Sequence, residues 1–217
     1  MRKFLSVLFV LALCLLPVSS WAQEQAEADE EKDALEVNFS AGLGLPLGGV
    51  KTWNDSLGAK SGFSGSFHFG YFLTSNVVVG GMFTFSQFGM DTSDPTLAQH
   101  HRLYYPAAYV KYHFFGSSDF VPFVEANVGA DFVKFSTFMY DGVVPKYREA
   151  GYTPGLGTGI ATGFHYYTSD MGGLYFQLGY HHGFTKNETK LYGGNEYTFG
   201  EDLSMFSVNA GIQVFFG

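Results

Sequence analysis

The sequence is poor in cysteine and in basic residues. Cys14 is the only cysteine among 217 residues, and it lies in an apolar run near the N-terminus. The rest of the chain therefore has no thiol with which to form a disulfide or a thiolate metal site. Lys and Arg number 12 against 20 Asp and Glu, so the formal net charge is −8. This balance does not favour nucleic acid as a partner.

The apolar run from Phe4 to Val18 follows Arg2 and Lys3 and precedes small residues, among them Ala22. This order predicts a secretory signal peptide over residues 1–22. A single membrane anchor is the alternative, but the run is short for a span and no stop-transfer charges follow it. Residues 23–34 contain six acids and no aromatic residue. They are predicted to form an acidic, disordered periplasmic leader.

Helical periodicity is hard to find after residue 35, whereas alternation of large apolar with small or polar residues recurs eight times. The pattern predicts an all-β, eight-stranded antiparallel up-and-down barrel over residues 35–217. Its connectors alternate between short turns and long loops, as in bacterial outer-membrane barrels, where the short turns are periplasmic. The predicted strands are 35–44, 62–73, 77–89, 102–115, 120–136, 153–167, 174–184 and 203–216. The short turns are 74–76, 117–119 and roughly 168–173, and the long loops are 45–61, 90–101, 137–152 and 185–202.

The short turns predict the register of the strands that they join. A three-residue turn at 117–119 places polar residues opposite polar ones and apolar residues opposite apolar ones, and a turn at 74–76 does the same. Each strand is therefore sorted into a polar and an apolar face. The predicted polar-face pairs are Lys111–Glu125, Tyr109–Asn127 and Tyr105–Asp131 in one hairpin, and His68–Met82, Ser66–Thr84 and Ser64–Ser86 in the other.

The strands carry few formal charges, which indicates which face points outward. A barrel with a water-facing surface normally uses Lys, Glu and Asp freely there. The apolar face, which includes Phe83, Val128 and Val208, is therefore predicted to contact lipid. A soluble lipocalin-like or avidin-like barrel, with its apolar face inside, is the alternative. The charged strand residues are Glu36, Arg102, Lys111, Glu125, Asp131 and Lys134.

Aromatic residues gather toward the ends of the predicted strands. Tyr71, Tyr166 and Tyr175 lie near the short turns, and Phe63 and Phe184 lie near the long loops. Two such rings match the aromatic girdles at the two bilayer interfaces.

The polar face is predicted to fill the lumen. We expect an ion pair between Lys111 and Glu125, because an unpaired charge in a low dielectric is costly. Eight strands enclose a space that side chains about fill, so a wide pore is not expected. Inward glycines between Gly155 and Gly163 favour a local void. The predicted lumen network consists of Lys111, Glu125, Tyr109, Asn127, Asp131, His68, His165 and Gln177.

The architecture and the alternation of the last strand, from Phe206 to Phe216, resemble the small eight-stranded outer-membrane barrels. These porin-like proteins include the OmpA membrane domain, OmpX and OmpW-like proteins. The resemblance implies a monomer in the outer membrane of a Gram-negative bacterium, in contact with outer-membrane lipid and lipopolysaccharide. It also implies a terminal aromatic that the barrel-assembly machinery recognises, although here Gly217 follows Phe216.

Several patterns that suggest chemistry have a simpler structural explanation. His100-His101 and His181-His182 are neighbours on strands, so their side chains point to opposite faces and no metal site is expected. The glycine-rich stretch 155–159 lies within an alternating strand and opens no helix, so it does not predict a phosphate loop. Ser86, Ser136 and His181 could meet near one rim, as a lipid-modifying enzyme requires, but no motif joins them. No catalytic residue, metal or cofactor is therefore predicted.

The sequence thus predicts a non-enzymatic barrel that acts through four surface loops in envelope structure, adhesion or ligand contact. A narrow channel for small solutes, including a lateral route for an apolar solute as proposed for OmpW-like proteins, is the first alternative. A lipid A-modifying enzyme is the second. Exposed aromatics can mark binding surfaces, and the candidate loop residues are Trp53, Phe138, Tyr140 and Tyr192.

Overall fold

The structure, a computed structural model, describes residues 35–48, 59–90, 100–114, 119–141, 144–151, 153–169, 171–186, 188–192, 195–199 and 203–216. Side chains are described at these positions except 90, 135–141, 144–151, 153, 185–186, 188–192 and 195–199. All of these residues belong to one compact unit, Asp33–Phe216. The predicted signal peptide, the leader and Gly217 lie outside the described residues.

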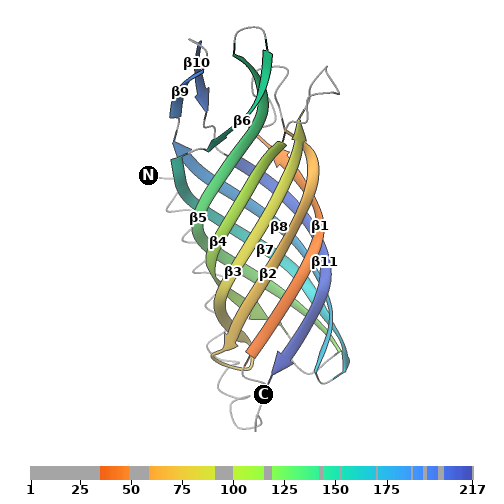
Figure 1. Ribbon diagram of the computed structural model, residues 1–217. Helices are drawn as coiled ribbons and strands as arrows, with labels where there is room; N and C mark the ends of the chain where they lie inside the picture. The colour runs from red at the N-terminus through yellow and green to blue at the C-terminus, as the bar shows by residue number, and fades with distance from the viewer. Residues whose placement is uncertain are drawn as a thin grey trace. The chain divides into compact units, whose positions relative to one another are not determined.

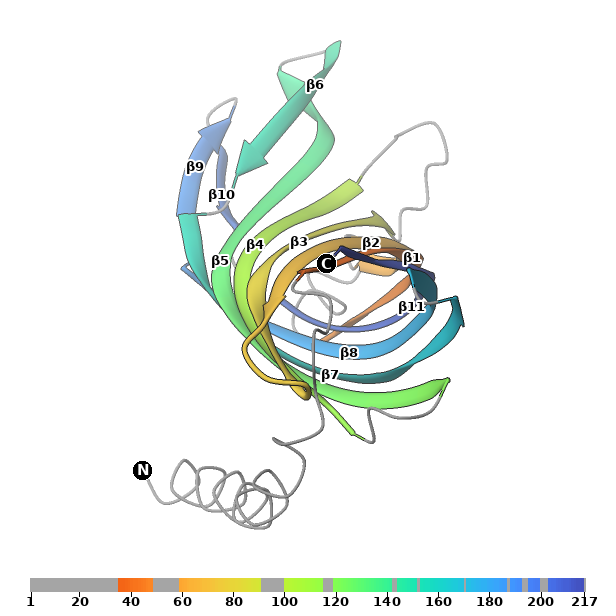
Figure 2. The ribbon, with the colours of Figure 1, turned by 90° about the horizontal axis from the view of Figure 1, so that it is seen from below.

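Eight antiparallel strands form a closed barrel, in which consecutive strands pair and β1 also pairs with the last strand, β11 (Figure 1). Pairing of β4 with β5 completes the ring, which Figure 2 shows from below. No helix among the described residues is long and apolar enough to cross a membrane. The barrel strands are β1 (Leu35–Leu47), β2 (Ala59–Phe72), β3 (Val77–Met90), β4 (His100–His113), β5 (Phe120–Asp141), β7 (Thr153–Ser169), β8 (Gly172–Lys186) and β11 (Leu203–Phe216).

The eight strands and their order agree with the prediction from the sequence. The registers of both analysed hairpins are also confirmed, since Lys111 lies opposite Glu125 and His68 lies opposite Met82. Both registers follow from turn length, because a side-chain period of two leaves one pairing that keeps all polar residues on one face.

Two of the predicted loops contain additional strands. β5 continues to Asp141 and pairs there with β6 (Val144–Gly151), while β9 (Glu188–Tyr192) pairs with β10 (Asn195–Phe199). The prediction of loops over 137–152 and 185–202 was therefore wrong. Asp141 pairs with Val144 and Tyr192 with Asn195, so each hairpin turns around two residues. The residues between the paired positions are Gly142-Val143 and Gly193-Gly194 in the sequence, and glycine in the first of two loop positions favours such tight turns.

The barrel has polar residues inside and apolar residues outside. β11 shows the alternation directly, since Met205, Ser207 and Asn209 are buried whereas Phe206 and Val208 are exposed. This orientation is the one predicted for a membrane barrel and the opposite of the soluble alternative. The exposed apolar residues on the outer surface include Phe39, Phe67, Phe83, Val110, Val124, Val128, Ile160, Leu178, Phe206, Val208 and Ile212.

The strands are longer than a membrane crossing requires. The shortest strand of the barrel, β1, has 13 residues, whereas a tilted strand of about 9–11 residues crosses a bilayer. Aromatic residues remain exposed near the strand ends, as Tyr71, Phe63 and Phe184 illustrate. Tyr175 was predicted to belong to the girdle near the short turns, but this was wrong, because it is only 1% exposed and faces the lumen. Residues 175 and 177 are both odd-numbered, so the side chains of Tyr175 and Gln177 point to the same side of β8, which is the lumen.

Candidate functional site in the barrel lumen

Formal charge in the barrel is divided between the lumen and the strand ends. Glu36, Lys111, Glu125 and Asp131 are all buried, with at most 4% exposure. On the outer surface, charges with described side chains lie near the ends of strands or in a turn. These outer residues are Lys60, Arg102, Lys134 and Asp119. The middle of the outer surface carries no formal charge among the residues whose side chains are described.

The end of the lumen nearest the short turns, here called the short-turn end, is filled by an ion pair between Lys111 and Glu36. Lys111 Nζ donates to Glu36 Oε1, and both side chains are completely buried. Asn38 Nδ2 donates to the same oxygen over 2.7 Å, and Gln213 Nε2 donates to Glu36 Oε2 over 3.0 Å. The Glu36 carboxylate therefore accepts three hydrogen bonds, which offset part of its desolvation.

The prediction that Lys111 forms an ion pair with Glu125 was wrong, because the partner of Lys111 is Glu36. The two residues are opposite in register, but the long lysine side chain reaches across the lumen to Glu36 on β1, which does not neighbour β4 in the sheet. Cross-strand pairing predicts neighbours along the wall. In a barrel this narrow, a flexible side chain can also reach the opposite wall.

Glu125 interacts instead with His68 and Asn127. Its Oε2 lies 3.5 Å from His68 Nε2, and its Oε1 accepts a hydrogen bond of 3.3 Å from Asn127 Nδ2. Lys111 Nζ also lies 5.1–5.4 Å from the ring centroids of Tyr109, Phe123 and Tyr175. At these distances a desolvated ammonium is attracted to the ring faces. Aromatic rings therefore share the stabilisation of the lysine with Glu36.

Two histidines lie beside Glu36 at the same end. His113 Nε2 is 3.5 Å from Glu36 Oε2, and the rings of His113 and His165 are 4.8 Å apart between centroids. His165 was predicted to be in the lumen, and the structure buries it completely. Glu36 and His113 were missed in the predicted network, although both share the inward parity of that network at the strand ends.

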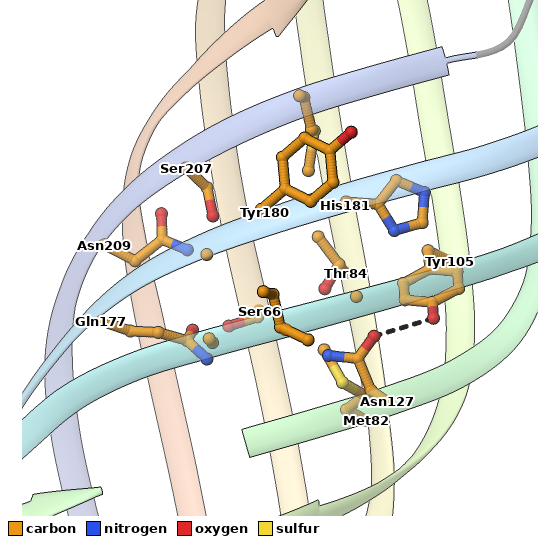
Figure 3. A pocket seen from close by; sticks show the side chains of 15 residues that line it. Ser66, Met82, Thr84, Tyr105, Asn127, Gln177, Tyr180, His181, Ser207 and Asn209 are labelled. Carbon is orange, nitrogen blue, oxygen red and sulfur yellow. Dashed lines mark hydrogen bonds between the residues drawn. The ribbon is translucent and has the colours of Figure 1, made fainter. Parts of the chain in front are cut away.

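The middle of the lumen contains a small cavity with both polar and apolar walls (Figure 3). Its volume is about 30 Å³, which is room for about two water molecules. Apolar Met82 and Met205 line it as well as polar Ser66, Thr84 and Gln177. The Tyr105 hydroxyl donates to Asn127 Oδ1 over 2.9 Å at its edge. Gly159, Ala161 and Gly179 also line it and offer no large side chain. The void expected between Gly155 and Gly163 is therefore present, but it is small.

A second buried carboxylate pairs with histidine on the far side of this cavity. Asp131 Oδ1 and Oδ2 lie 3.0 and 3.1 Å from His181 Nε2, and the Tyr105 ring lies 4.3 Å from the His181 ring between centroids. The carboxylate occupies space left by Gly157 and Gly183, where a Cβ would collide with it. The glycines in β7 and β8 thus make room for Asp131 as well as for the cavity.

The Asp131–His181 pair does not complete the constellation that a serine enzyme requires. His181 Nδ1 has no hydrogen-bond partner among the described residues. The Ser86 hydroxyl, a predicted candidate nucleophile, donates to Ser64 Oγ over 3.1 Å. The side chain of Ser136 is outside the described set. No interaction between described residues joins Ser86 to His181.

Apolar side chains close the lumen toward the end from which β5, β6, β9 and β10 extend, here called the extended end (Figure 1). Leu103 and Val133 lie opposite each other in register there. Phe88 on β3 and Leu203 and Met205 on β11 also face inward, and none of these five residues is more than 3% exposed. These apolar side chains fill the lumen at this level together with His101, which is 1% exposed and lies opposite Phe88 in register.

The candidate surface residues are only partly described. Trp53 lies outside the described residues. Phe138 and Tyr140 lie in the extension of β5, opposite Tyr147 and Pro145 of β6, and Tyr192 ends β9. These three residues were predicted to lie in loops and instead lie in strands of the two hairpins.

Comparison with solved structures supports the architecture. The neisserial surface protein A, NspA, is 18% identical and superposes with a TM-score of 0.54, covering 86% of this chain and 100% of its own. A major outer membrane protein from Thermus thermophilus is 14% identical, with a TM-score of 0.55, covering 84% of this chain and 100% of its own. No protein-family model and no curated protein sequence matches the chain. The chain therefore has the fold of the small eight-stranded outer-membrane barrels, as its sequence pattern predicts.

Proposed function

We propose that this protein is an integral barrel of the bacterial outer membrane, in contact with membrane lipid and lipopolysaccharide along its outer surface. The observation that carries the proposal is the position of charge: four charged residues are buried in the lumen, and the described outer surface has none at mid-height. Exposed Phe83, Val128 and Val208 would be costly in water and suit hydrocarbon. The likeness in fold to NspA and the Thermus protein agrees with this location.

The lumen supports a role other than bulk diffusion. The ion pair of Lys111 and Glu36 fills one end, and the layer with Leu103 and Phe88 fills the other. The cavity between them has a volume of only about 30 Å³. A hydrated ion would have to displace both layers, so we propose that the barrel does not conduct. We also propose that it is not an enzyme, because no contact between described residues joins Ser86 to the Asp131–His181 pair.

The protein then acts through the parts of the chain at the extended end. β6 pairs with the extension of β5, and β9 pairs with β10, so two hairpins continue from the barrel wall at this end (Figure 1). We place this end at the cell surface, because outer-membrane barrels keep their short turns in the periplasm. Adhesion, envelope packing or ligand contact would use these hairpins, including Phe138, Tyr140 and Tyr192, together with Trp53.

Epitope insertion tests this orientation. An epitope inserted between Gly193 and Gly194 should be labelled by antibody on intact cells, because these residues join β9 to β10 at the proposed outer end. The matched control is the same epitope inserted at Ser75, in the short turn between β2 and β3, which should be labelled only after the outer membrane is permeabilised. The reverse pattern would contradict the orientation.

A narrow solute channel is the competing function, favoured by the cavity at Gly159 and Gly179. Planar-bilayer recording separates the two. We expect purified protein to give no discrete conductance steps in 1 M KCl, while a general porin studied in parallel gives them. Reproducible steps that change when Leu103 is replaced by alanine would establish a channel through the apolar layer and overturn the proposed closed lumen.

A further inference from the structure

We propose that Glu36, His113 and His165 form a binding site for one divalent transition-metal ion, with Zn²⁺ as the best fit. Among the described residues, these three side chains form a group whose possible ligand atoms all lie within 4.8 Å of one another. They come from β1, β4 and β7, so the site joins three strands of the barrel wall. It lies at the short-turn end of the lumen, apart from the surface hairpins.

The first argument is that the histidine nitrogens lack partners. Both ring nitrogens of His165, and Nε2 of His113, are buried without a hydrogen bond to any described residue. A buried polar atom without a hydrogen-bond partner is destabilising, because it has lost its hydration. His113 and His165 are nevertheless at most 2% exposed. A shared metal ion would satisfy one nitrogen of each ring.

The distances fit a site that closes on binding. Tetrahedral ligands at bond lengths of about 2.0–2.1 Å lie about 3.4 Å from one another. His113 Nε2 and Glu36 Oε2 are already 3.5 Å apart. The remaining separations, at most 4.8 Å, must shorten by up to about 1.4 Å through an inward movement of the His165 ring to reach that geometry.

The local charge also favours a cation, although one group opposes it. The short-turn end holds two carboxylates, Glu36 and Glu125, against one ammonium, Lys111. Lys111 binds Glu36 through Oε1, which leaves Oε2 for the metal beside its hydrogen bond from Gln213. The ammonium repels a second cation and should weaken the site relative to one that lacks it.

Aromatic side chains surround the rings of His113 and His165. Phe123 lies 4.8 Å from the His165 ring and 6.4 Å from the His113 ring, and Phe72 lies 5.6 Å from the His113 ring, all between centroids. Tyr167 stacks on His165 at 6.2 Å. An apolar shell limits competition by water and fixes the ring planes. Three protein ligands leave a fourth position for a water molecule.

The donor set selects the class of metal. Two imidazoles and one carboxylate suit Zn²⁺ and its neighbours in the late first row, whereas Ca²⁺ and Mg²⁺ prefer oxygen ligands alone. The adjacent pairs His100-His101 and His181-His182 did not predict this site, because its ligands come from three strands. The sequence does indicate that His113, His165 and Glu36 all face inward at the same end of the barrel.

The test uses full-length, untagged protein folded in detergent, stripped with chelator, and then titrated with Zn²⁺ or Co²⁺. Metal is supplied in two ways, to the folded protein and during refolding, so that a closed lumen does not hide the site. We expect one equivalent to bind, with visible Co²⁺ absorption bands of tetrahedral type that Zn²⁺ abolishes. Less than one-tenth of an equivalent by both routes would overturn the proposal.

Variants assign the site to its residues. His113→Gln and His165→Gln should each weaken Zn²⁺ binding by more than about 100-fold, because even changes to groups that only support the ligands cost 10–100-fold. His181→Gln is the matched control, since His181 is also buried in the lumen beside a carboxylate, and it should bind as the wild type does. Equal loss in all three variants, or in none, would contradict the assignment.

A measurement on the wild type covers the case in which a variant fails to fold. X-ray absorption at the zinc edge should fit two imidazole nitrogens and one or two oxygens at about 2.0–2.2 Å. A fit without imidazole, or with more than two, would show that the metal is bound elsewhere and would overturn the site.

Discussion

The inner and outer faces of this barrel are made from the same strands but follow opposite rules. Lys111 and Glu125 are buried on the inner face, while Val110 and Val124, each one residue earlier, are exposed on the outer face. In a protein with a water-facing surface, these two sets would exchange places. The comparison teaches that two features of the sequence answer two questions. The side-chain period of two identifies the strands, and the face that carries the charges shows whether lipid or water surrounds the barrel.

The two ends of the inner face differ in a second way. At the short-turn end, Glu36 is held by an ammonium and two amides. Beyond the cavity, Asp131 is held by His181 alone among its described ion-pair partners. Toward the extended end the lumen becomes apolar, with Leu103 and Phe88. Electrostatic stabilisation is therefore concentrated at one end, and packing closes the other.

Removing the single buried ammonium among the described side chains should have the largest effect on stability. Lys111→Met leaves Glu36 and Glu125 without their nearest formal cation, and we expect a loss of about 3–5 kcal/mol in the free energy of unfolding. Urea titration in lipid vesicles, followed by tryptophan fluorescence or gel mobility, measures it. Adding Glu36→Gln to Lys111→Met should recover part of the loss.

A double-mutant cycle then separates the two carboxylates. Coupling of Lys111 to Glu36 should exceed its coupling to Glu125, because only Glu36 accepts its hydrogen bond among the described contacts. Equal couplings, or a larger one to Glu125, would restore the pairing expected from the hairpin register and remove the contact across the lumen.

Placing charge on the outer face should come next. Val128→Arg, Phe83→Arg or Val208→Arg at mid-height should each destabilise the folded barrel in bilayers by roughly 2–4 kcal/mol. Leu45→Arg, near the end of β1, is the matched control and should cost about 0–1 kcal/mol, because arginine there lies near the interface. Unchanged stability at Val128, measured in the same vesicles, would reverse the assignment of inside and outside.

Filling the space beside Asp131 tests whether glycine is required at the second carboxylate. Gly183→Ala places a Cβ against Asp131 Oδ2 and should cost about 1–3 kcal/mol, the usual range for overpacking. Gly81→Ala is the control, since the nearest atom to its Cβ would be a carbonyl oxygen 4.0 Å away. If both variants unfold at the same urea concentration as the wild type, Asp131 does not occupy this space.

The smallest expected effect concerns the hydrogen bond at the edge of the cavity. Tyr105→Phe removes the donor to Asn127 Oδ1 and should cost about 0.5–1.5 kcal/mol in unfolding free energy. The same substitution at Tyr104, which packs against Phe85 on the outer face with the ring centroids 5.3 Å apart, serves as the comparison. A larger loss at Tyr104 would place the important hydroxyl outside the lumen.

The sequence predicted the barrel well because its signals were local. Eight alternating segments, their turn lengths and the side-chain period determined the strand number, the registers and the polar face of the Lys111–Glu125 hairpin. The hairpins at the extended end were missed because charged residues such as Lys146 and Glu149 suggested loops. A glycine in the first of the two connecting positions, Gly142 and Gly193, was the stronger signal there.

The interior of the site was harder to predict because it depends on contacts between distant strands. Lys111 meets Glu36 across the lumen, 75 positions away in the sequence. His113 and His165 meet beside Glu36 only because the ring closes. The alternation along each strand indicated that these residues face inward. Which of them touch depends on the tilt of the strands and on the reach of the side chains, and the alternation contains no information on either.

The most direct test of the central claim, a membrane barrel with an apolar exterior, is fractionation of the native protein followed by gel mobility with and without boiling. We expect recovery in the outer-membrane fraction and a band that shifts when boiling unfolds the barrel. Recovery as a soluble periplasmic or secreted protein would contradict the account, because the exposed Phe83, Val128 and Val208 would then need another partner than lipid.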